Sequence, residues 1–204
     1  MRIKPEPDRL DRRRHAIMES ARHLFVEQGF NRTTLGNIVD QSGGSMATIY
    51  KLFGSKEGLL AAVIFAKATS GETLVQRNFN SEDAPGAVLR RIAMDLHEEF
   101  LNPASVALVR IVIAHSIENP EFARHFFEST ATRTRDALIR LFEDWHRSGV
   151  DMTAPPALLA EIFLGLNVGD LQTEAISHGN VEQISAEKLD VRTKFFLRGA
   201  GLND

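Results

Sequence analysis

Residues 45–51 combine short hydroxyl and methyl side chains with one phenol and one amine. Ser45, Ala47 and Thr48 are small enough for the backbone to approach a phosphate or a base edge, and the threonine methyl suits a thymine methyl. Tyr50 is the only tyrosine of the chain, and its phenol can donate a hydrogen bond to a phosphate oxygen. These residue types in one short segment indicate contact with nucleic acid.

Charge is unevenly distributed along the chain. Residues 1–60 hold ten Lys and Arg against seven Asp and Glu, whereas the remainder holds fourteen against twenty, which gives −3 overall. A basic head on an acidic body favours an anionic partner for the head. Arg12, Arg13 and Arg14 could reach a DNA groove or backbone; a solvated N-terminal arm without a partner explains the same charge.

Helical spacing dominates the sequence. Apolar residues recur at intervals of three and four almost everywhere, and no stretch alternates with period two, which predicts an all-α protein. The first helix covers residues 11–28 and ends at Gly29, and the third covers residues 46–53, capped by Ser45 and ended by Gly54. Further helices are expected at residues 56–78, 85–101, 103–117, 122–147, 156–177 and 186–197.

The second and third helices are separated by a tight glycine turn after residue 41. This arrangement lets one helix brace across a DNA backbone while the next enters the major groove. Ile49, Leu52 and Phe53 can face a small core, which leaves the other side of the third helix exposed. The outward residues are then Ser45, Met46, Thr48 and Lys51.

Residues 33–59 read TTLGNIVDQSGGSMATIYKLFGSKEGL and resemble the DNA-binding segment of TetR-family transcriptional repressors. The shared features are the threonine pair, a turn of small residues, the Ile-Tyr-x-x-Phe pattern and the Ser-Lys-Glu restart. The resemblance implies a helix-turn-helix domain at residues 11–57. It also implies a helical effector-binding and dimerisation domain at residues 58–204.

The resemblance implies DNA-contacting roles for the residues that match the family's DNA-binding segment. The DNA-binding set is Thr33, Thr34, Ser45, Met46, Ala47, Thr48, Tyr50, Lys51 and Lys56. Thr34, Tyr50 and Lys56 are expected at phosphates and the others toward the groove; alternatively, Tyr50 is a packing residue and Lys56 a solvated charge. Gly44 stands where the family usually has valine, so the third helix is expected to be less firmly seated.

Residues 106–170 resemble the C-terminal domain of a TetR-family branch that includes multidrug-efflux regulators. This resemblance implies a subunit interface and an effector pocket. The expected interface residues are Leu159, Ile162, Phe163, Leu166, Phe195 and Phe196. The expected pocket residues are Met94, His97, Arg110, His115, Phe122, Phe126, Trp145, Phe163 and Asn167, and ordinary core packing is the alternative for each of them.

An enzyme and a protein-interaction adaptor are the two alternatives to a DNA-binding regulator. An enzyme is disfavoured because the chain has no dinucleotide fingerprint, Walker lysine, G-x-S-x-G elbow or cysteine, so no cofactor and no metal is expected. A helical protein-interaction adaptor that binds no DNA remains the alternative. Without an apolar leader or a charge-free span, the chain is expected to be cytoplasmic. The sequence thus predicts a homodimeric regulator, most simply a repressor, on a pseudo-palindromic operator in double-stranded DNA, released by a small apolar or amphipathic effector.

Overall fold

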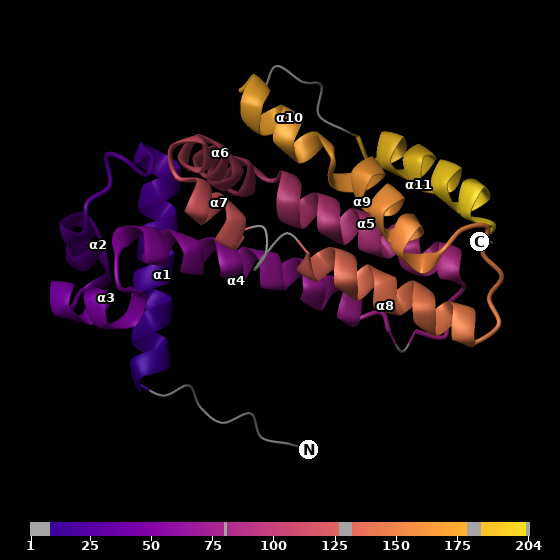
Figure 1. Ribbon diagram of the computed structural model, residues 1–204, viewed down its shortest axis with the longest axis horizontal. Helices are drawn as coiled ribbons and strands as arrows, with labels where there is room; N and C mark the ends of the chain where they lie inside the picture. Colours follow the sequence, from indigo (N-terminus) through magenta and orange to yellow (C-terminus); the bar gives the residue numbers. More distant parts are fainter. Residues whose placement is uncertain (1–8, 80, 127–131, 179–184, 203–204) are drawn as a thin grey trace. The chain divides into compact units, whose positions relative to one another are not determined.

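Helices form all the regular structure in the computed structural model, which describes residues 9–79, 81–126, 132–178 and 185–202 and leaves the side chains of residues 68–70, 123, 125 and 126 undescribed. The prediction of an all-α protein is confirmed. The chain forms two compact units, Met1–Ala66 and Lys67–Asp204 (Figure 1).

The N-terminal unit consists of α1 (Arg9–Gln28), α2 (Leu35–Ser42), α3 (Met46–Phe53) and the first part of α4 (Lys56–Gln76). Its core begins on α1, where Ile17, Ala21 and Phe25 follow one another at intervals of four and are fully buried. Ile38 of α2 and Ile49 of α3 are also fully buried. One residue from each short helix therefore fixes which of its faces is turned inward.

Glycines separate these short helices. Gly29 follows α1 with φ +82° and Gly54 follows α3 with φ +75°, a backbone conformation that glycine adopts without the penalty of a Cβ. The predicted ends of the first and third helices are therefore found where the sequence placed them. α1 begins two residues earlier than expected, at Arg9.

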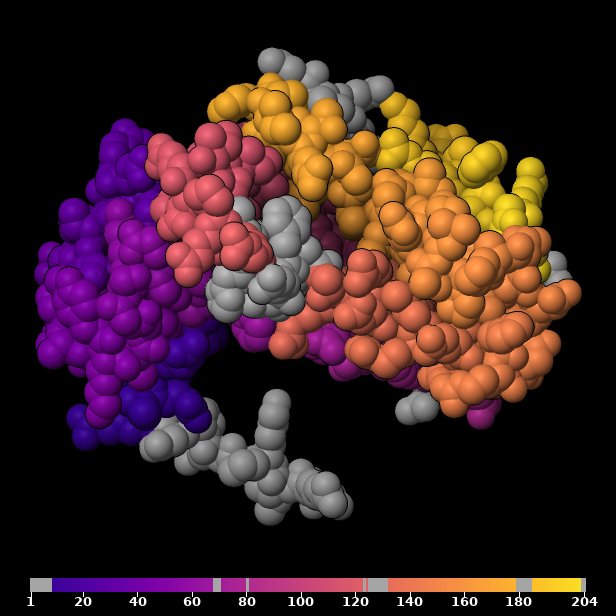
Figure 2. Space-filling view, viewed as in Figure 1, coloured from indigo at the N-terminus to yellow at the C-terminus, as the bar shows by residue number. Residues whose placement is uncertain are grey.

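Within the described residues, the second unit contains the remainder of α4 and seven further helices. They are α5 (Pro85–Leu101), α6 (Pro103–Glu118), α7 (Pro120–Phe126), α8 (Arg133–Arg147), α9 (Pro156–Val168), α10 (Asp170–Ser177) and α11 (Ala186–Ala200). α9 packs against both α8 and α11, and α11 also packs against α5. Figure 2 shows α8 and α9 meeting along one face. The ring of Phe196 lies 5.2 Å from that of Phe163 and 6.2 Å from that of Phe142, which joins α11, α9 and α8 in one aromatic core.

Two of the long predicted helices are each replaced by a pair. The stretch expected as one helix over residues 122–147 covers most of α7, which begins at Pro120 and ends at Phe126, and all of α8, which begins at Arg133. Residues 127–131 between them lie outside the described part of the chain. Pro103, Pro120 and Pro156 each stand at the first position of a helix, where a missing amide hydrogen costs nothing.

The stretch expected as one helix over residues 156–177 divides at Gly169 into α9 and α10. A side chain from α11 holds the division: the Arg192 guanidinium donates to the Leu166 carbonyl oxygen at 3.0 Å and to the Asp170 carboxylate at 2.6 Å. The carbonyl at the end of α9 and the carboxylate at the start of α10 thus share one partner. Apolar spacing continues across the division, so periodicity did not reveal it.

α4 is the most membrane-like helix by length and composition, with a mean hydropathy of 1.3 over its most apolar window. α5 and α6, which are bent relative to each other, are long and apolar enough to cross a membrane only if the pair is counted as one span. α4 buries Leu59, Leu60 and Val63 in the N-terminal unit, and this core role accounts for its apolar composition.

Candidate nucleic-acid interface

Polar side chains cap the starts of α2 and α3. At α2, the Thr34 hydroxyl accepts from the amide of Asn37 at 3.1 Å, and the Asn37 side-chain oxygen accepts from the amide of Thr34 at 3.0 Å. At α3, the Ser45 hydroxyl accepts from the amide of Thr48 at 3.3 Å. These caps satisfy amides that the helices leave without partners, and they fix the point at which each helix begins.

α3 has one buried and one exposed face. Ile49 is fully buried, whereas Met46, Ala47, Tyr50 and Lys51 are exposed; the Tyr50 side chain is 53% accessible. Residues at such spacings share one side of a helix. The structure therefore presents a thioether, a methyl group, a phenol and an amine on a single outward surface, which we call the α3 face.

Two consecutive arginines of α1 hold α3 and the turn before it. The Arg13 guanidinium donates to the Ser42 carbonyl oxygen at 3.0 Å, at the end of α2. The Arg14 guanidinium donates to the Leu52 carbonyl oxygen at 3.3 Å and lies 4.8 Å from the centre of the Phe53 ring. α3 is thereby braced from α1 near both its start and its end.

Lys56, at the start of α4, lies against an aromatic ring. Its Nζ is 4.2 Å from the centre of the Phe30 ring. Burial lowers the pKa of Lys56 below its ordinary value, and the neighbouring carboxylate of Glu57 opposes that shift. The ring holds the ammonium group at a defined place close to the N-terminal end of α4, where anions are favoured.

The threonine pair differs from its expected role. Thr33 is fully buried, and its hydroxyl lies within donating distance of two carbonyl oxygens, that of Gly29 at 2.8 Å and that of Leu24 at 3.2 Å. The expectation that the Thr33 side chain contacts DNA is therefore corrected. Thr34 is exposed, but its hydroxyl lies 2.7 Å from the Asn37 side-chain oxygen, where it donates. A phosphate contact by Thr34 would compete with that bond.

Replacing Thr34 with alanine is expected to lower the free energy of unfolding by about 1 kcal/mol, since both capping hydrogen bonds depend on its hydroxyl or on the geometry that it maintains. Serine at the same position keeps the hydroxyl and should restore most of the loss. Urea denaturation followed by circular dichroism measures both variants. Equal losses for alanine and serine would contradict a capping role.

Comparisons with known proteins follow the same division of the chain. The model of the bacterial regulatory proteins of the tetR family matches residues 17–63, which include α2 and α3. The model of the C-terminal domain of AefR-like transcriptional repressors matches residues 87–195, more than half of the chain. The chain belongs to the TetR family. As a member of this family it is a DNA-binding regulator of transcription, a class whose members are generally not enzymes.

Individual relatives support this assignment over nearly the full length of the chain. The HTH-type transcriptional regulator YfiR of Bacillus subtilis is 24% identical over 89% of this chain and 85% of its own. The structure of a TetR-family regulator from Mesorhizobium loti superposes with a TM-score of 0.82 at 23% identity, covering 95% of this chain and 98% of its own. The flavonoid-responsive regulator FrrA is 30% identical, with a TM-score of 0.68 over 93% of this chain and 97% of its own.

Three residues expected in the effector pocket of this TetR-family regulator lie in its core. Phe163 is fully buried against Phe196, and Trp145 packs its ring 5.6 Å from that of Phe142. Asn167 is fully buried, with its amide donating to the Phe163 carbonyl oxygen at 2.8 Å. The packing alternative fits Phe163 and Asn167 best, because neither side chain reaches the surface.

Other expected pocket residues are scattered over the C-terminal unit. Met94 is 59% exposed on α5, so the expectation that it lines a pocket is corrected. Arg110 donates from Nε to the Ala175 carbonyl oxygen at 2.9 Å and so links α6 to α10. His115 meets Phe122 edge to face at 4.7 Å. The Phe126 side chain lies outside the described part of the structure.

His97 is a pocket candidate with a buried polar atom. Its Nδ1 is buried and has no hydrogen-bond partner among the described residues of the chain. A buried ring nitrogen without a partner has a free-energy cost that a ligand hydroxyl could remove. No motif marks this residue; it was predicted only as a polar group among apolar neighbours.

The expected subunit interface divides between surface and core. Leu159, Phe163 and Phe196 are buried within the protomer, so their assignment to an interface is corrected. Leu166 is half-buried against the same core, while Ile162 and Phe195 are exposed. Sequence reasoning missed the exposed neighbours Leu158 and Val191. The cause is that α9 is apolar on most sides, so its periodicity does not separate an inner from an outer face.

Proposed function

We propose that this regulator is a homodimeric repressor whose two copies of α3 enter successive major grooves of a pseudo-palindromic operator. The α3 face carries the proposal: Ile49 is buried beneath it, and Met46, Ala47, Tyr50 and Lys51 are exposed together on it. Small and hydrogen-bonding side chains on one side of a short helix suit the readout of base edges. A DNA-binding repressor of this kind works in the cytoplasm.

Dimerisation is supported by the apolar face that α9 and α11 expose. Leu158, Ile162, Val191 and Phe195 are all at least two-fifths accessible, although their two helices pack against each other. We call these four residues the α9/α11 face. Exposed large apolar side chains on two helices that pack together favour an association surface. A second copy of the chain supplies an identical face and the two-fold symmetry that a palindromic operator requires.

Effector response is supported by His97 and by the position of α4. The unpartnered Nδ1 of His97 can accept from a ligand hydroxyl, and FrrA is by its name a flavonoid-responsive regulator. α4 belongs to both compact units, so a ligand that shifts α4 would act on the unit that carries α3. An effector that binds the DNA-free state more tightly than the DNA-binding state by about 5.5 kcal/mol changes the ratio of the two states from 1:99 to 99:1.

Fluorescence anisotropy on labelled duplexes from the DNA upstream of the gene tests this function. We expect saturable binding, far tighter than to random duplex and falling steeply with salt. Hydroxylated aromatic compounds are then added to the complex, and at least one is expected to release the DNA. Equal, weak binding to every duplex, with intact dimers, would instead favour the adaptor that binds protein and not DNA.

Tyr50→Phe gives a sharper prediction because it removes a single oxygen from the exposed α3 face. The expected result is about a hundredfold loss of operator affinity, about tenfold for the hydrogen bond to a charged phosphate that each of the two protomers loses, with an unchanged unfolding midpoint. The same anisotropy titration measures the affinity. Unchanged affinity, or a lowered unfolding midpoint, would show that the phenol is a packing group.

A further inference from the structure

Gly44, in the turn between α2 and α3, leaves room for an arginine. A Cβ added at Gly44 would lie 1.8 Å from Nη2, 2.6 Å from Cζ and 2.9 Å from Nε of Arg13. The guanidinium therefore occupies the volume that a side chain at position 44 would need. The φ angle of +101° at Gly44 is a second reason for glycine there. The expected loss of an apolar anchor is thus accompanied by a polar brace from α1.

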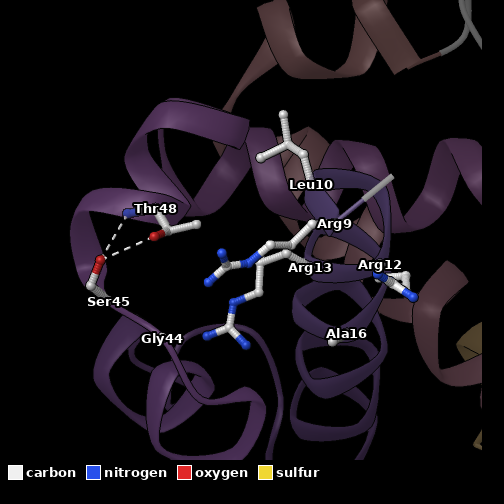
Figure 3. A pocket seen from close by; sticks show the side chains of 8 residues that line it. All are labelled: Arg9, Leu10, Arg12, Arg13, Ala16, Gly44, Ser45 and Thr48. Carbon is white, nitrogen blue, oxygen red and sulfur yellow. Dashed lines mark hydrogen bonds between the residues drawn. The ribbon is translucent and has the colours of Figure 1, made fainter. Parts of the chain in front are cut away.

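Arg13 lies in a basic groove between α1 and the start of α3. The groove measures about 860 Å³, and none of the described residues that line it is acidic. Its lining residues are Arg9, Leu10, Arg12, Arg13, Ala16, Gly44, Ser45 and Thr48. Figure 3 shows Arg9 and Arg13 extending from α1 toward the Ser45 side, while Arg12 points away. The groove therefore joins cationic groups to two hydroxyls on the first turn of α3.

The contacts of Arg13 leave donors for an anion. A guanidinium has five N–H donors in a rigid fork, and the Ser42 carbonyl oxygen accepts from Nη1. That bond fixes the plane of the group, so little side-chain freedom remains to be lost on binding. A phosphate matches the fork geometry of the remaining donors.

DNA is the phosphate source that this position favours. Ser45 and Thr48 line the groove, and Met46 and Ala47, exposed between them in sequence, belong to the α3 face. A helix that enters the major groove brings its first turn close to the flanking sugar-phosphate backbone. The groove is therefore continuous with the surface that the proposed function places on DNA.

We propose that this groove binds a phosphate of the operator backbone, with Arg13 as the phosphate-binding group and Gly44 as the residue that makes room for it. The site rests on the proposed function. Its contribution is independent of base sequence, because a phosphate carries no base identity. Each protomer then neutralises one further phosphate and releases counterions from it.

Arg13→Gln tests the site, since glutamine retains a donor for the Ser42 carbonyl but removes the charge. The slope of log K against log salt should become shallower by about 1.8 for a dimer, so that wild-type and variant affinities converge about twelvefold between 50 and 200 mM salt. Operator and random duplex should lose affinity alike. Arg22→Gln is the matched control: it removes an equal charge from α1, about 13.5 Å along the helix, where Arg22 pairs with Glu19.

Gly44→Ala tests whether the space beside Gly44 is needed for the Arg13 guanidinium. It is compared with Gly29→Ala, because both glycines have positive φ but a Cβ at Gly29 meets nothing within 4 Å. Gly44→Ala should give the same shallower slope of log K against log salt as Arg13→Gln. The double variant should have the slope of Arg13→Gln alone. Gly29→Ala should keep the wild-type slope despite its backbone strain. Circular dichroism confirms that each variant is folded.

The outcomes separate this site from the proposed function. If Arg13→Gln keeps the wild-type slope on the operator, Arg13 is a brace of the turn only and the phosphate site is overturned. If Gly44→Ala keeps the wild-type slope, Gly44 is not needed to make room for the Arg13 guanidinium, and that role is overturned. Absence of saturable DNA binding by the unmodified chain would overturn the proposed function itself and the site with it.

Discussion

Ile162→Glu combined with Phe195→Glu is expected to leave the chain monomeric and to abolish operator binding. Both side chains are exposed in the protomer, at 43% and 73%, on the α9/α11 face. Buried carboxylates without partners cost several kcal/mol each, and a two-fold interface would contain four of them. The dimer dissociation constant should therefore rise by about a thousandfold or more. Sedimentation velocity measures the change.

Two glycines contribute to this expectation. A Cβ at Gly165 of α9 or at Gly199 of α11 would meet nothing within 4 Å, so both positions are open in the protomer. Small residues on facing helices allow close approach of a partner. Ile117→Glu, which adds one carboxylate at an exposed position of α6, is the control and should remain dimeric. A double variant that stays dimeric would contradict the proposed interface.

Phe163→Ala is expected to lower the free energy of unfolding by about 3–5 kcal/mol, the cost of emptying a large and fully buried site. Phe163 joins α9 to α11 through its edge-to-face contact with Phe196. From its sequence context, Phe163 was expected both in the effector pocket and at the dimer interface. Urea denaturation at a fixed protein concentration measures the loss, which keeps the linkage to dimerisation constant.

Met94→Ala is the matched comparison for Phe163→Ala. Both residues were expected to line the pocket, but Met94 is mostly exposed on α5, so its truncation should cost no more than about 0.5 kcal/mol. A loss below about 1 kcal/mol for Phe163→Ala would show that its ring is not part of the packed core. A large loss for Met94→Ala would show that its side chain is held by contacts at the surface of the protomer.

The short helices of the first unit were predictable because their ends are marked locally. Ser45 caps α3 through its own hydroxyl, and Gly29 and Gly54 adopt the positive φ that ends a helix. The division at Gly169 is different in kind. It depends on Arg192, which binds Leu166 and Asp170 from more than twenty residues away. Local periodicity contains no information about such a bond.

The candidate site shows the same limit. Ile49 is the buried residue of α3, and spacing alone predicted its burial and the exposure of Ser45, Met46 and Lys51. Thr48 was also expected on the outward side but is half-buried, whereas Ala47 and Tyr50 are exposed. Thr33 and Thr34 are adjacent and chemically alike, and only the folded chain shows that one is buried and the other caps α2. The contact of Arg13 with the turn at Gly44 joins residues 31 positions apart, and neither residue signals it by itself.

Selection of duplexes from a random library by the unmodified protein tests the central claim most directly, because it needs no knowledge of the operator. We expect enrichment of one sequence with two inverted half-sites, their centres about 10 base pairs or a multiple of that apart, since a two-fold dimer presents two copies of α3. Tyr50→Phe protein should enrich the same sequence more weakly. Failure of the unmodified protein to enrich any sequence, while remaining folded and dimeric, would contradict a sequence-specific regulator that reads DNA through α3.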